Sequence, residues 1–185
     1  YNAMMFISLI FRLSMPIDDD WGFFAHRRIN RTAVFTLPPE MIGFYKKHIQ
    51  YITDKAVNPD MRRYVNPDEA ARHYIDLDVY GDSALYKLPR YWSQAVEQYT
   101  EDTLKKYGIV PWHIQQVKYY LTRAFKNQDT RQVLRISADL GHYIGDAHVP
   151  LHTTENYNGQ LTGQYGIHGF WESRLPELFF DEYNL

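Results

Sequence analysis

Residues 129–152, DTRQVLRISADLGHYIGDAHVPLH, decide the fold and also carry the strongest chemical signal in the chain. Their first part has apolar residues every three or four positions, which is the period of an amphipathic helix. These residues are Val133, Leu134, Ile136, Leu140 and Ile144. Val149-Pro150 is a helix-ending pair. The pattern therefore predicts a helix over 129–148.

The end of this stretch has the spacing of a metal site. His142 and Asp146 are four residues apart, so on a helix both project from one face toward the same point. His152 follows the break at Pro150, where the chain can turn back toward the same cavity. The segment 168–172, HGFWE, repeats the spacing of four on a second helix. Together these positions predict a cluster of ligands.

One pair of this kind can be an ordinary contact within a helix, but the chain offers more. Five of its 8 histidines lie where a single cluster could use them. There are no cysteines, so a metal site must use imidazole, carboxylate or backbone groups, and imidazole with carboxylate suits zinc. We expect His48 and His113 to be ordinary surface or core residues. His148 is two residues from Asp146, and we expect it to support the site without binding metal.

The composition limits the classes of function. A chain of 185 residues with 45% hydrophobic residues can bury the core of one domain. Its formal charge of −2 gives no basic footprint for duplex DNA, while a short or single-stranded substrate stays possible. No transmembrane segment is expected, because the apolar run 4–11 is too short to cross a bilayer. We interpret residues 1–20 as a leader or a remnant of cloning, outside the fold.

The remainder, residues 21–185, predicts an all-α single domain with a metal cluster in a cleft between helices. No stretch alternates long enough to demand a strand. The expected helices are separated by Pro and Gly, and Pro39 and Pro67 each open one. They cover residues 23–35, 39–48, a segment from 67, 90–106, 111–126, 129–148 and 168–180, with a polar loop at 153–167.

The ordered set of histidines and carboxylates resembles a known family. It comprises Trp21-Gly22-x3-His26, Asp60-x12-His73, His142-x3-Asp146-x5-His152 and His168-x3-Glu172. This set is similar to that of the zinc-dependent phospholipases C and single-strand-specific nucleases, and the likeness runs from Trp21 to the end of the chain. The resemblance implies three zincs in a helical cleft. It assigns Asp60, His73, His142 and Asp146 to the first, His152, His168 and Glu172 to the second, and Trp21 and His26, with Asp146 bridging, to the third.

The same resemblance implies hydrolysis of a phosphodiester bond by zinc-activated water. Two zinc ions a few Å apart can share a water and lower its pKa toward about 7, while a third stabilises the leaving oxygen. We expect Asp146 to act as a bridge and Asp60 to be both ligand and proton acceptor. Asp54 and Asp68 compete for the ligand position of Asp60, although Asp68 follows a proline and suits the start of a helix.

The third site depends on Trp21. In the family the tryptophan is the mature N-terminus, whose amine and carbonyl bind the third zinc. Trp21 is internal in this sequence, and an amide nitrogen is a poor ligand. We therefore expect two zinc sites, with a third only if Trp21 becomes a free N-terminus. The family also implies a periplasmic or secreted protein, although no clear signal sequence is present.

The substrate is left open between single-stranded nucleic acid and a phospholipid head group. Met61 and Ala70 stand where choline-specific relatives have an aromatic cage, which argues against choline. Tyr74 and Asp76 match positions that the nucleases use for base stacking and for the base edge, but Tyr74 is equally typical of core packing. Glu172 matches the phospholipase branch instead. The sequence does not indicate an oligomeric state.

One rival to an enzyme remains. The chain ends at Leu185, soon after the last ligand segment, so relative to the family we interpret it as truncated at its C-terminus. A non-catalytic helical module with structural zinc is therefore the main rival to an enzyme. Structural sites are closed and four-coordinate, whereas catalytic sites leave a position open to water.

Overall fold

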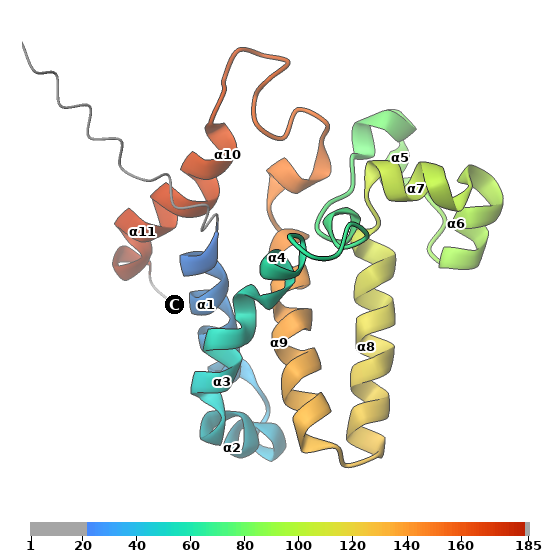
Figure 1. Cartoon of the computed structure of the whole chain (residues 1–185). Coiled ribbons are helices and arrows are strands. Elements are labelled where there is room, and N and C mark those ends of the chain that lie inside the picture. Colours follow the sequence, from blue (N-terminus) through green and yellow to red (C-terminus); the bar gives the residue numbers. More distant parts are fainter. Residues whose placement is uncertain (1–21, 184–185) are drawn as a thin grey trace, which may run out of the picture.

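Two antiparallel helices, α8 (Val110–Lys126) and α9 (Thr130–Asp146), form the centre of the computed structural model, which describes residues 22–183 (Figure 1). The Asp129 side chain caps α9 by accepting the backbone N–H of Gln132 at 3.0 Å. Gln128, with φ 54°, makes the tight turn between them. Both helices agree with their predicted ranges to within two residues.

On the other side of α9, the chain packs two N-terminal helices. Helix α1 (Phe23–Ala33) and helix α3 (Ile49–Asp54) lie against each other and against α9, and α2 (Pro39–Lys47) joins them, beginning at a proline as predicted (Figure 1). Buried Asn30 donates a hydrogen bond to the Ala138 carbonyl at 3.0 Å, which ties α1 to α9. This contact holds α1 along the face of α9 that carries His142.

The remaining elements are short. They are η1 (Val34–Thr36), η2 (Lys55–Val57), α4 (Asn58–Arg62), η3 (Ala70–Arg72), η4 (Leu77–Tyr80), α5 (Ala84–Lys87), α6 (Trp92–Tyr99), α7 (Glu101–Tyr107), η5 (Pro150–Thr153), α10 (Ile167–Gly169), η6 (Phe170–Arg174), α11 (Leu175–Phe179) and η7 (Phe180–Glu182). No strand occurs between residues 22 and 183, so the predicted all-α single domain is confirmed.

Two predicted helices were wrong in detail. The segment from Pro67 makes only turns and the short η3, and residues 74–76 that follow have no regular secondary structure. The helix predicted over 90–106 is divided between α6 and α7 at Thr100, whose φ of 67° is incompatible with a continuous helix. The Thr100 hydroxyl instead caps α7 by accepting the N–H of Thr103.

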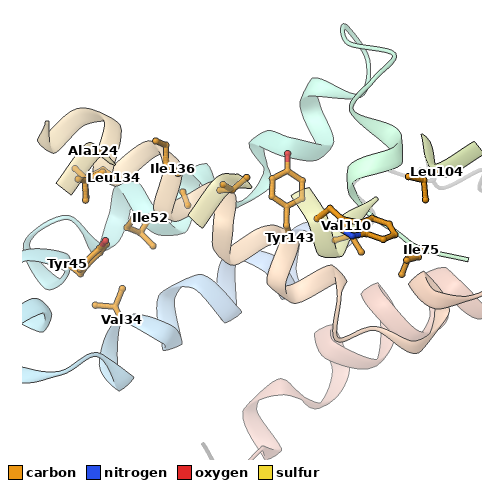
Figure 2. Packing of buried hydrophobic residues seen from close by; sticks show 14 of the residues in the cluster. Val34, Tyr45, Ile52, Ile75, Leu104, Val110, Ala124, Leu134, Ile136 and Tyr143 are labelled. Carbon is orange, nitrogen blue, oxygen red and sulfur yellow. The ribbon is translucent and has the colours of Figure 1, made fainter. Parts of the chain in front are cut away.

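The hydrophobic core lies between the α8–α9 pair and the elements on either side of it. Figure 2 shows Ile52, Leu134 and Ile136 packed toward one end of this core and Val110, Ile75 and Tyr143 toward the other. Four of the five apolar residues predicted for α9 are buried or partly buried in it. The prediction for Ile144 was wrong: 39% of its surface is exposed, because it lies off the stripe of α9 that faces the core.

Within the described residues, no helix is long and apolar enough to span a bilayer. Residues 1–20 and Trp21 lie outside the described part of the chain, so the expectations that concern them stay predictions.

Candidate metal centre

Three groups of imidazole and carboxylate donors could each hold a metal ion. They are His26, His142 and Asp146; Asp60, His73 and His142; and His152, His168 and Glu172. In each group the donor atoms lie within 4.8 Å of one another. Every ligand position predicted from the sequence within the described residues belongs to one of these groups. His142 belongs to two, so the first two groups are contiguous.

Asp146 lies at the centre of the first two groups. Its Oδ1 is 3.2 Å from His26 Nε2, and its Oδ2 is 2.9 Å from His73 Nδ1 and 3.2 Å from His142 Nε2. The two oxygens thus face different histidines. A carboxylate in this position is suited to bridge two adjacent cations.

The last two turns of α9 and the facing turn of α1 place His142 and His26. The two rings are stacked, with centroids 3.9 Å apart and planes 24° apart. His142 Nδ1 donates to the Ala56 carbonyl at 2.8 Å, which turns the lone pair of Nε2 toward the cluster. His142 is fully buried, so its orientation is fixed from all sides.

The irregular segment after η3 places His73, and its backbone is fixed from two directions. Val110 N donates to the Tyr74 carbonyl at 3.2 Å, and Ile75 N donates to the His152 carbonyl at 2.9 Å. Asp60, on the short helix α4, lies opposite: its Oδ1 is 3.5 Å from His73 Nδ1 and 3.6 Å from His142 Nε2. The tertiary structure brings these donors together from separate elements.

The third group lies where the chain returns after the polar loop at 153–167. His152 Nδ1 donates to the His73 carbonyl at 2.6 Å, and its Nε2 lies 2.7 Å from Glu172 Oε1. His168 Nε2 lies 2.9 Å from Glu172 Oε2. Glu172 is on η6, a π-helical turn, and such turns are common at functional sites. Gly22 N donates to the Ser173 hydroxyl at 2.9 Å, which ties the start of α1 to this turn.

Burial and neighbouring charges perturb the donors strongly. Burial alone would raise the pKa of Asp146, but the three imidazoles around it hold that pKa well below its usual range. Burial opposes the charge on His152 as well, yet Glu172 raises the pKa of His152 to about 9, and the pKa of Glu172 falls to about 2. A protonated imidazole must lose its proton to bind a metal, so metal binding at His152 would be expected to release a proton.

The donors line a cavity of about 880 Å³. All of the candidate ligands among the described residues except His142 contribute to its wall, and so do Tyr74 and Asp76, the residues predicted to bind substrate. The Tyr74 hydroxyl donates to the Lys106 carbonyl at 3.1 Å, which holds its ring in place. Burial, with Asp78 and Glu155, raises the pKa of Asp76 to about 6.

Other histidines and aspartates lie outside the three groups. His148 is exposed, and its Nδ1 is 2.7 Å from the Ile144 carbonyl, while His113 packs edge-on against Tyr143, with ring centroids 4.5 Å apart. His48 packs against Phe44. The two competitors for the position of Asp60, Asp54 and Asp68, are exposed and absent from the ligand groups.

A buried polar network behind His73 was missed in the sequence. Glu69 is fully buried and accepts hydrogen bonds from the Tyr143 hydroxyl and from Arg62 and Arg72. Arg62 also pairs with buried Asp139 at 3.2 Å. The spacing of four between Glu69 and His73 was a usable signal, since it is the same spacing that revealed the ligand pairs.

Comparisons with protein-family models, with curated proteins and with solved structures gave no significant match.

Proposed function

We propose that this chain is a zinc-dependent hydrolase of phosphodiester bonds. The observation that carries the proposal is the convergence of three donor groups on one cavity, with Asp146 shared by His26, His73 and His142. A protein with a single structural metal site would not need a second and a third group of donors along the wall of the same cavity. The cavity leaves room for water and substrate beside the donors, which favours a catalytic centre over the structural alternative.

The donor chemistry fits zinc. Tetrahedral zinc with ligand bonds of about 2.0–2.1 Å separates its ligand atoms by about 3.3 Å. His73 Nδ1 and His142 Nε2 are 3.1 Å apart, and each is about as far from the Asp60 oxygen, at 3.5 and 3.6 Å. We propose that Asp60, His73, His142 and Asp146 hold one ion and that His152, His168 and Glu172 hold another. When bound, zinc would polarise a phosphoryl oxygen and supply a water of lowered pKa.

The carboxylates around the cavity have different roles in this proposal. Asp146, with 2% of its side chain exposed, bridges and orients the imidazoles. Asp60 has 16% of its side chain exposed and lines the cavity, so its carboxylate can accept the proton of the attacking water. Buried Asp146 is poorly placed to exchange a proton with solvent.

The rest of the cavity wall suits a short phosphodiester with a planar or apolar group attached. Arg63 lines the cavity next to Asp60, 3.8 Å away, and offers a cation to a phosphate oxygen. Aromatic rings of Phe23, Tyr64 and Tyr157 line it as well. Single-stranded nucleic acid and a phospholipid head group are both compatible with this wall. An extracytoplasmic location stays a prediction from the family resemblance.

The test combines metal analysis with three substrates. Purified protein is analysed for zinc and then assayed on bis(p-nitrophenyl) phosphate, single-stranded DNA or RNA, and short-chain phosphatidylcholine, with and without chelator. The proposal expects at least two zincs per chain and hydrolysis that stops with chelator and returns with zinc. Tightly bound zinc without turnover of any substrate would favour the structural module instead.

A further inference from the structure

The two nitrogens of His73 face different surroundings. Nδ1 faces the donor cluster, 2.9 Å from Asp146 Oδ2, whereas Nε2 points away from it and lies 3.8 Å from Glu69 Oε1. This Nε2 is buried and has no hydrogen-bond partner among residues 22–183. A buried imidazole N–H without a partner is costly, so the nearest acceptor matters.

Two of the other ligand histidines show how an outer nitrogen is used in this site, whereas the outer Nδ1 of His26 is buried without a hydrogen-bond partner in the described part of the chain. His142 and His152 each donate their Nδ1–H to a backbone carbonyl, at 2.8 and 2.6 Å, and each turns Nε2 toward the cluster. His73 is oriented the opposite way, and its outer nitrogen faces a carboxylate in place of a carbonyl. In His142 and His152 the orientation of the ring is thus set by a hydrogen bond on the side away from the cluster.

Glu69 is itself rigidly held. Its side chain has no exposed surface, and its oxygens accept hydrogen bonds from Tyr143, from Arg62 at 3.3 Å and from Arg72 at 2.6 Å. Two arginines balance its charge within the protein. The carboxylate is therefore a fixed acceptor directly behind His73.

We propose that Glu69 is a positioning residue for His73, accepting the Nε2–H so that the lone pair of Nδ1 points at the metal. A shift of about 1 Å brings Nε2 within hydrogen-bond range of Oε1. This inference rests on the proposed zinc site. Carboxylates behind ligand histidines fix the ring and increase its basicity, and their loss costs about 10–100-fold in metal affinity.

The test compares Glu69→Gln with Asp139→Asn. Both substitutions turn a buried carboxylate into an amide, and both residues pair with Arg62, but only Glu69 faces His73. Zinc affinity is measured by chelator competition, and the imidazole N–H signal of His73 is followed by NMR in the zinc-loaded protein. Circular dichroism confirms folding. If Glu69→Gln does not fold, Glu69→Asp replaces it, since it keeps the charge but withdraws the carboxylate by one methylene.

The expected result is a 10–100-fold loss of zinc affinity in the Glu69 variant, with a faster-exchanging, upfield-shifted His73 N–H, and a change below about threefold in Asp139→Asn. Equal losses in the two variants, or none in the Glu69 variant, would overturn the inference. Absence of bound zinc from the wild-type protein would overturn the metal proposal and this inference together. Zinc binding without hydrolysis would contradict only the proposed activity.

Discussion

The rings of His26 and His142 are stacked 3.9 Å apart across the α1–α9 interface, and two glycines on α9 allow this approach. A Cβ at Gly145 would lie 3.3 Å from His26 Nδ1, and one at Gly141 would overlap the side chain of Asn30. The close packing of α1 against α9 therefore also sets the geometry of the donors, because it places His26 beside Asp146.

Replacing Gly141 should disrupt this interface. A methyl group in Gly141→Ala would displace buried Asn30, so we expect the free energy of unfolding to fall by about 2 kcal/mol or more. At exposed Gly43 in α2, an added methyl group would meet no atom within 4 Å, so Gly43→Ala should stabilise by up to about 1 kcal/mol. Denaturant unfolding measures both. Similar effects of the two substitutions would contradict the close-packing account.

Asp146→Asn should weaken more than one metal site, because its two oxygens face different imidazoles. In protein trimmed so that Trp21 has a free amine, where a third zinc is expected, the bound zinc should fall by more than one ion per chain. Hydrolysis should drop by more than about 100-fold, exceeding the loss typical of an outer residue. His148→Ala is the matched control, since His148 lies two residues away and belongs to no ligand group. Loss of a single zinc in the trimmed Asp146→Asn protein would argue against the bridging role.

The metal content should depend on the N-terminus. We expect two zincs in protein that carries residues 1–20 and a third in protein trimmed so that Trp21 has a free amine, since the group of His26, His142 and Asp146 is the one that the family resemblance pairs with Trp21. Elemental analysis of the two forms, prepared in parallel, measures the difference. A full third site in the untrimmed protein would show that the amine is not needed.

Tyr74 separates the two substrate classes. If its ring stacks on a base, Tyr74→Leu should raise KM for single-stranded nucleic acid by about 10–100-fold, the loss expected for one stacking contact. Tyr74→Phe keeps the ring and loses only the hydrogen bond to the Lys106 carbonyl, so its KM should change little. An unchanged KM in Tyr74→Leu would indicate that the ring is packing alone.

His113 should make stability depend on pH. Burial, reinforced by Arg72, lowers the pKa of His113 to about 4, whereas the unfolded chain has the ordinary value near 6.5. Below pH 6.5 the unfolded state binds a proton at His113 that the folded state excludes. The free energy of unfolding is therefore unaffected by His113 above pH 6.5 and is lowered by it progressively as the pH falls toward 4. Wild-type protein should therefore lose more unfolding free energy between pH 7 and 4.5 than His113→Gln. Parallel pH profiles of the two would contradict the prediction.

The sequence by itself indicated the long helices and two pairs of candidate donors. Spacing of four places His142 with Asp146 and His168 with Glu172, because a helix returns to the same face after four residues. The apolar period of 129–148 similarly predicted α9. Local signals failed at Thr100 and after Pro67, where backbone conformation and long-range hydrogen bonds outweigh helix propensity.

Only the tertiary structure decided which donors meet. His152 is far in sequence from Asp60 and His73, and no local pattern distinguishes Asp60 from Asp54. Their juxtaposition follows from α4, from the backbone bonds around His73 and from the return of the chain after Pro150. The burial of Glu69 behind His73 has the same origin, since a carboxylate enters the core only where tertiary contacts supply its donors.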